Sequence, residues 1–164
     1  MSNEPLLGGF IPENGPMEFN FIVSGIAVTQ GSMKSFVLPP KRGIPGARPR
    51  AIITHDKRPE LMNWRQSIAA SALAAGVHRV EGMAIEVTAT FVLPRPASLS
   101  RKTVRCIKRP DLDKLFRSFD GLTGVAWKDD SQIDSIIAKK RYVREGESCG
   151  LHVRLTYWPV NSEL

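Results

Sequence analysis

The sequence has few residues of the kinds that build disulfide frameworks and zinc sites. It contains two cysteines, Cys106 and Cys149, and three histidines. The cysteines lie far apart and form no CxxC or Cys/His cluster, which argues against a structural zinc ion and against a disulfide-stabilised fold. A reducing compartment, the cytoplasm of a bacterial cell, is the simplest setting for such a chain.

The sequence also lacks long hydrophobic runs. Its first residues, MSNEPLLGGFIPENGPME, have neither the basic start of a secretion signal nor the apolar length of a membrane span. We therefore expect residues 1–17 to form a flexible arm and the protein not to enter a membrane. With 164 residues, 42% of them hydrophobic, the chain can build one core, and we expect residues 18–160 to form a single domain.

Acidic residues are nearly absent from two segments of this basic chain, whose net charge is +7. Residues 31–59 carry a single acid, Asp56, and residues 95–110 carry none. The first segment is rich in Pro and Gly and the second contains two prolines, as expected of loops that follow a phosphate backbone. The alternative is a pair of solvated loops, and composition alone does not decide between them. The candidate DNA-binding residues in and beside these segments are Lys34, Lys41, Arg42, Arg48, Arg50, Lys108, Arg109 and Lys114.

The pattern of apolar residues predicts an α+β fold. Alternating apolar residues, or short β-branched runs, indicate strands, and apolar residues at helical spacing indicate helices. We expect ββαβαββ or a close variant, with a mixed or largely antiparallel sheet and two helices packed on one face. The expected strands cover 18–29, 51–54, 83–93, 133–143 and 151–158, and the expected helices cover about 59–75, ending at Gly76, and about 112–122, ending at Gly121 or Gly124.

The first candidate site is the DxD motif formed by Asp111 and Asp113. Residues two apart diverge by about 200° inside a helix, but they point the same way in an extended segment. Pro110 biases the preceding residue toward an extended conformation, and either aspartate is a good N-cap for the helix that follows. The two carboxylates should therefore face one point at a loop-to-helix junction. Arg117 should lie one turn along the helix from Asp113.

The second candidate site is the acidic pair Asp129 and Asp130, in a turn before a predicted strand. Adjacent carboxylates repel each other unless a positive charge lies beside them, and magnesium prefers such oxygen ligands. A lone DxD is usually a helix cap, and a lone DD pair is usually a turn. Both together, with Lys108, Arg109 and Lys128 nearby, favour a metal site in which Asp111, Asp113 and Asp130 converge on one Mg²⁺ centre.

The ordered motifs KRPDLDKL (108–115), DGLTG (120–124), DDSQI (129–133) and KKRY (139–142) resemble the RusA-type Holliday-junction resolvases of phages and prophages. The resemblance implies a homodimeric, magnesium-dependent endodeoxyribonuclease. Such an enzyme acts in DNA recombination and repair and resolves four-way junctions by paired symmetric nicks.

Transferred position by position, the resemblance places the acidic catalytic and metal-binding residues at Asp111, Asp113 and Asp130, with Asp129 as a fourth candidate. A basic residue that matters in some members falls on Arg117, where the best-studied branch has lysine. A guanidinium stays protonated, so Arg117 is assigned to phosphate or transition-state charge and not to proton transfer.

Two other functions remain open from the sequence. One is a flap or general structure-selective nuclease that uses the same metal site. The other is a non-catalytic DNA-binding module in which the acids only cap helices. Trp127 or Phe36 would be the aromatic wedge at a branch point, although core packing is the commoner role of a residue such as Trp127.

Overall fold

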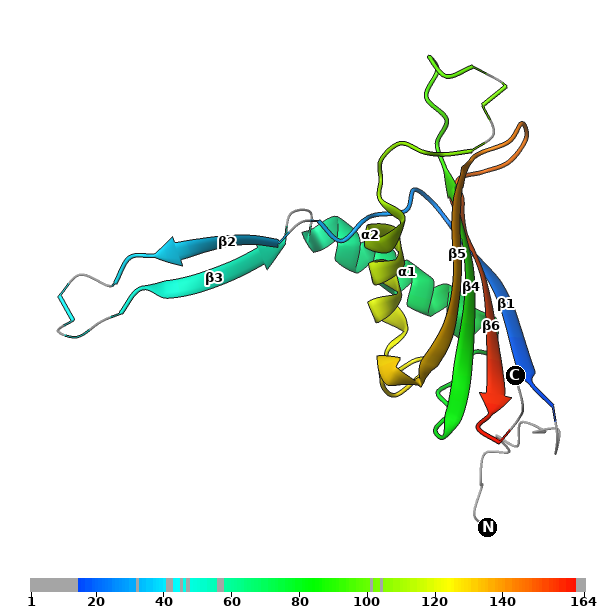
Figure 1. Ribbon diagram of the computed structural model, residues 1–164, viewed down its shortest axis with the longest axis horizontal. Helices are drawn as coiled ribbons and strands as arrows, with labels where there is room; N and C mark the ends of the chain where they lie inside the picture. Colours follow the sequence, from blue (N-terminus) through cyan, green and yellow to red (C-terminus); the bar gives the residue numbers. More distant parts are fainter. Residues whose placement is uncertain are drawn as a thin grey trace, which may run out of the picture.

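Four strands form the main sheet of the protein (Figure 1). The structure, a computed structural model, describes residues 15–31, 33–40, 43–44, 46, 48–55, 58–100, 102–103 and 105–161. The strand order is β1 (Met17–Ser24), β6 (Gly150–Pro159), β4 (Met83–Leu93) and β5 (Ile133–Tyr142). β6 pairs antiparallel with β1 and β4, whereas β5 pairs parallel with β4. The sheet is therefore mixed, as the sequence predicts.

One face of the sheet carries the helices and the core. Helix α1 spans Arg58–Ala74, and helix α2 (Leu112–Phe116) continues into the 3-10 helix η1 (Arg117–Leu122). Ile68 of α1, Leu115 of α2 and Phe119 of η1 are buried against the inner residues of the strands. The ring of Phe119 stacks on Phe116 and meets Phe91 of β4 edge to face. These contacts confirm the predicted single-domain α+β fold with helices on one face.

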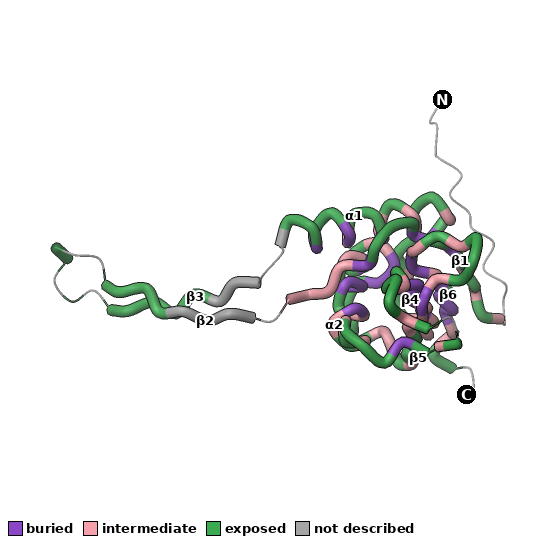
Figure 2. Tube along the Cα trace, turned by 90° about the horizontal axis from the view of Figure 1, so that it is seen from above, coloured by how far each residue is buried: buried purple, intermediate pink, exposed green. Residues whose placement is uncertain are grey.

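A second, two-stranded sheet stands apart from this body. β2 (Met33–Leu38) pairs antiparallel with β3 (Arg50–His55), with Phe36 opposite Ile52. Figures 1 and 2 show this hairpin pointing away from the body. The sequence did not predict β2. Its described side chains, Val37 and Leu38, point to opposite faces and are both exposed, and a strand exposed on both faces needs no alternation of apolar and polar residues.

Three boundaries differ from the sequence prediction. β1 ends at Ser24 and not at residue 29, because Gly25 turns the chain with φ of 127°. The second helix is α-helical for only five residues before it tightens into η1. β1 also begins at Met17, inside the expected flexible arm; residues 1–14 of that arm lie outside the described residues.

Strands β5 and β6 are consecutive in the chain but not neighbours in the sheet, because β4 lies between them. This order places β5 at the sheet edge, alongside α2 (Figure 1). Among the described residues, no helix combines the length and the apolar character that crossing a bilayer requires.

Candidate active site

Asp111 and Asp113 lie at the start of α2. Asp111 is the N-cap residue, with an extended backbone (φ −70°, ψ 139°), and Asp113 lies in the first turn. Both side chains are exposed. The predicted loop-to-helix junction is therefore confirmed, although the Asp111 carboxylate does not itself cap the helix.

Each of these carboxylates has a cation beside it. Lys114 Nζ lies 3.0 Å from Asp111 Oδ2, and Arg117 Nη2 lies 3.8 Å from Asp113 Oδ2, one turn along as predicted. The hydrogen bond and the charge of Lys114 lower the pKa of Asp111, and the charges of Arg109 and Lys140 add to the effect. The Asp111 carboxylate is therefore ionised at neutral pH in a positive surrounding.

Two contacts from distant segments fix the position of this motif. The Lys140 ammonium of β5 donates to the carbonyl oxygens of Lys108 and Pro110, each at 2.8 Å. On the other side, the backbone N–H of Gln30 donates to the carbonyl oxygen of Lys114 at 3.1 Å. The DxD motif is therefore held between the edge strand and the segment that leads into the β2–β3 hairpin.

Asp129 and Asp130 lie at η2 (Asp130–Gln132), where both have local partners. Asp130 Oδ1 accepts hydrogen bonds from Trp127 Nε1 at 2.7 Å and from Thr123 Oγ1 at 2.8 Å. Asp129 caps η2 by accepting from the N–H of Ser131 at 2.9 Å, and hydrogen bonding to Ser131 lowers the pKa of Asp129. Trp127 is buried in the core, which confirms the packing role expected for it.

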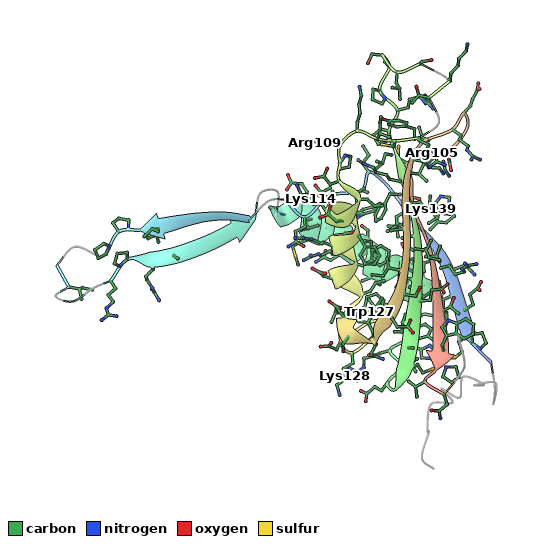
Figure 3. The ribbon with its side chains drawn as sticks, in the orientation of Figure 1. Arg105, Arg109, Lys114, Trp127, Lys128 and Lys139 are labelled. Carbon is green, nitrogen blue, oxygen red and sulfur yellow. The ribbon has the colours of Figure 1, made fainter. Side chains whose placement is uncertain are left out.

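The structure does not bring Asp130 to Asp111 and Asp113 within one chain. α2 and η1 separate the two acidic segments, and their five and six residues span about 20 Å at the usual rises of the two helix types. The length of β5 gives a similar separation between the two acidic segments. Asp130 lies just before the first residue of β5, whereas Lys140, near the end of β5, contacts Pro110. Figure 3 shows Lys114 and Trp127 toward opposite ends of this segment.

In line with that separation, the described part of the chain contains no group of three His, Cys, Asp or Glu side chains placed to hold one metal ion. The expectation of a single centre built from all three aspartates is therefore not met in one copy. The Asp111–Asp113 pair alone still fits magnesium in the chemistry of its donors, because magnesium is commonly held by one or two carboxylates, with substrate phosphates and waters completing its shell.

Cations surround the acidic end of α2. Lys108 and Arg109 are exposed just before the DxD motif, and Lys114 is half-buried beside it. Figure 3 shows Arg109 and Lys114 in this region, whereas Lys128 lies at the far end. Of the other predicted DNA-binding residues, Arg48 and Arg50 are exposed on the hairpin; Lys41, Arg42 and the side chain of Lys34 lie outside the described residues.

Arg65 of α1 is a residue of this region to which the sequence analysis gave no role. Its Nη2 donates to Asp120 Oδ2 at 2.5 Å, to the carbonyl oxygen of Arg117 at 3.0 Å and to Gln30 Oε1 at 3.3 Å. Arg65 therefore ties η1 to α1 and to the segment before the hairpin. No local pattern indicates this contact, because Arg65 and Asp120 are 55 residues apart in the chain.

The chain is similar to a known protein family. Residues 42–156 match the family model described as Endodeoxyribonuclease RusA, and the match includes α1, both acidic segments and β5. No curated protein matches the chain.

Proposed function

The chain belongs to the RusA endodeoxyribonuclease family, and from that premise we propose that it resolves four-way DNA junctions by magnesium-dependent hydrolysis of two symmetric strands. The observation that carries this proposal is the end of α2. There, two exposed carboxylates lie among Arg109, Lys114 and Arg117, so a phosphodiester can be drawn to the acids by the cations around them.

Asp111 and Asp113 are the residues proposed to hold magnesium. When bound, the ion supplies Lewis-acid activation of water and neutralises charge on the phosphate. The permanent charge of the Arg117 guanidinium is available to a phosphate oxygen, and it cannot move a proton at neutral pH. Lys114 and Arg109 keep the Asp111 carboxylate ionised.

The proposal includes a homodimer, because a junction presents two equivalent strands that must be cut together. The dimer also offers a place for Asp130 and its neighbour Asp129. About 20 Å of α2 and η1 separates Asp130 from the DxD motif of its own chain, so a catalytic Asp130 has to reach the motif of the second copy. A phage origin and action in the cytoplasm of a bacterial host complete the proposal.

Replacing Asp113 by Asn tests the catalytic assignment. We expect Asp113→Asn to slow cleavage of a four-way junction by at least about 100-fold, because a ligand charge at the metal is lost while the shape of the side chain stays. The matched control is Asp134→Asn. Asp134 is exposed on β5 and forms no ion pair among the described residues. Both variants and the wild type are assayed in magnesium and in EDTA.

The same assay separates the competing functions. Equal cleavage by wild type and Asp113→Asn would remove Asp113 from the mechanism. Faster cleavage of a flap than of a junction would indicate a general structure-selective nuclease. Junction binding without cleavage by the wild type in magnesium would indicate a binding module.

A further inference from the structure

Among the described residues, nothing covers either face of the β2–β3 hairpin. A two-stranded hairpin alone is only marginally stable in water, because it buries little apolar surface. Here Val37, Leu38, Ile44 and Ile52 are nevertheless all exposed. Figures 1 and 2 show the hairpin projecting from the body, so the described part of the fold leaves these side chains to solvent. An exposed apolar ribbon of this kind indicates a surface that a partner covers.

The charge of the hairpin indicates which kind of partner covers it. Residues 31–55 contain five Lys or Arg residues and no acid, and Arg48 and Arg50 are exposed. A second copy of a chain with net charge +7 would be repelled on average, whereas a polyanion would be attracted. DNA therefore fits this surface better than another copy of the protein.

On one face of the hairpin, the cationic side chain of Arg50 lies beside two apolar side chains. Leu38 pairs with Arg50 and Phe36 pairs with Ile52, and directly paired residues lie on the same face of an antiparallel ribbon. Arg50 is thus flanked by Leu38 across the ribbon and by Ile52 along β3. A phosphate contact and an apolar contact can be made together from this face.

We propose that the β2–β3 hairpin is a DNA-binding arm that enters a groove at the branch point, with its arginines on phosphates and its apolar side chains against unstacked bases. This inference rests on the proposed function and deepens it. A six-residue strand extends about 20 Å, and the major groove, about 12 Å wide, accepts a two-stranded ribbon. Apolar side chains stabilise distorted DNA by filling the space between unstacked bases.

The base of the arm lies beside the candidate active site. The hydrogen bond from Gln30 to Lys114 joins the segment entering the arm to α2 directly after the DxD motif. DNA that follows the arm from its tip to its base would therefore reach the end of α2 that carries Asp111 and Asp113. Strand β2 precedes residues 42–156, so the family match does not cover the complete arm.

The test compares apolar and charged variants of the full-length protein in EDTA, where binding is measured without cleavage. In Ile52→Thr, the side chain stays β-branched, so the strand keeps its preference while losing apolar surface on the face that carries Arg50. The matched control is Ile137→Thr, because Ile137 is 42% exposed against 37% for Ile52. Arg48→Ala/Arg50→Ala removes the described charges of the arm.

The probes are a four-way junction with 2-aminopurine at the branch point and a linear duplex of the same sequence. We expect the wild type to raise the 2-aminopurine fluorescence and Ile52→Thr to lose that rise. The Thr variant should bind the junction about 10-fold more weakly and bind the duplex as before. The Arg variant should bind both DNAs more weakly, with the slope of log affinity against log salt reduced by about 2.

Three results would contradict the proposal that the hairpin is a DNA-binding arm. The first is that both arm variants bind the junction as tightly as the wild type does. The second is that the control variant loses as much junction affinity as the Thr variant. The third is an unchanged affinity together with a lower oligomer mass in sedimentation, which would make the hairpin an interface between copies. Thermal unfolding confirms that each variant stays folded. A wild type that binds junctions through the arm but never cuts them would refute the proposed nuclease function and would still support DNA binding by the arm.

Discussion

Asp130 illustrates how a carboxylate can take part in local structure and still be a candidate for catalysis. One of its oxygens accepts hydrogen bonds from the buried indole of Trp127 and from Thr123. The same side chain therefore closes the turn that leads into β5. Loss of activity in an Asp130 variant would consequently be ambiguous unless the fold is measured as well.

Two substitutions separate these roles. Asp130→Ala leaves the indole N–H of Trp127 buried without an acceptor, so we expect a loss of about 1–3 kcal/mol in the free energy of unfolding. Asp130→Asn keeps an acceptor oxygen and should unfold near the wild-type midpoint in urea. Because the Asn variant keeps the turn, its cleavage rate reports on the negative charge alone. Equal stability of Asp130→Ala and wild type would refute the structural role.

At the scale of elements, the contact between η1 and α1 positions Arg117. Gly121 of η1 packs so closely on α1 that a Cβ would lie 2.8 Å from Arg65 Cβ and 2.9 Å from the Arg65 carbonyl oxygen. On the α1 side of this contact, the Arg65 side chain donates hydrogen bonds to Arg117 and Asp120 of η1. The close approach depends on the absence of a side chain at residue 121.

We expect Gly121→Ala to lower the free energy of unfolding by about 1–3 kcal/mol, because backbone atoms must separate to admit the methyl group. Urea unfolding measures the loss. Gly15→Ala is the control, since a Cβ there meets nothing within 4 Å. An unchanged midpoint for Gly121→Ala would mean that α1 and η1 can move apart without cost.

The turn between β5 and β6 gives a second element-scale prediction. Glu147 accepts hydrogen bonds from both terminal nitrogens of Arg141 and from the N–H of Arg144. Chiefly through the Arg141 hydrogen bond, the pKa of Glu147 falls from 4.5 to about 2. A depressed carboxyl pKa contributes stability above the unfolded value of 4.5, and this contribution is lost as pH falls toward 2.

Glu147→Gln should therefore be less stable than wild type at pH 7, and the difference should shrink as pH falls from about 5 to about 3. Urea midpoints across this range measure it. Glu145→Gln is the matched control, because Glu145 is exposed in the same turn and forms no ion pair among the described residues. A difference in urea midpoint that stays constant with pH would show that the ionisation of Glu147 beside Arg141 does not contribute to stability.

At the scale of the whole molecule, the two acidic segments lie at opposite ends of the α2–η1 segment. If both act in one reaction, the complete site combines Asp111 and Asp113 of one copy with Asp130 of the other. A dimer would then hold two such composite sites, which matches the two strands of a junction.

Mixing inactive variants tests this arrangement. A dimer of one Asp113→Asn chain and one Asp130→Asn chain would have one site with both changes and one wild-type site. We expect the mixture to recover cleavage that neither variant shows alone and to nick a cruciform plasmid without linearising it. Recovery fails if all three aspartates act within one chain, because each chain then carries a defect. Subunit exchange is confirmed by mass beforehand.

The sequence by itself determined much of the local structure around the candidate site. The alternation of apolar residues in β4 and β6, the start of a helix at the DxD motif and the one-turn spacing of Asp113 and Arg117 are short-range properties, because strand and helix geometry fixes which neighbours in the chain share a face. The ordered motifs around Asp111 and Asp130 also indicated the family.

Only the tertiary structure decided how far apart the acidic segments lie, that β4 separates β5 from β6, and that β2 and β3 leave the body as a hairpin. These properties depend on contacts between residues far apart in the chain, such as Arg65 with Asp120 and Lys140 with Pro110. Such contacts form because packing the core orients whole elements, and no short stretch of sequence contains that information.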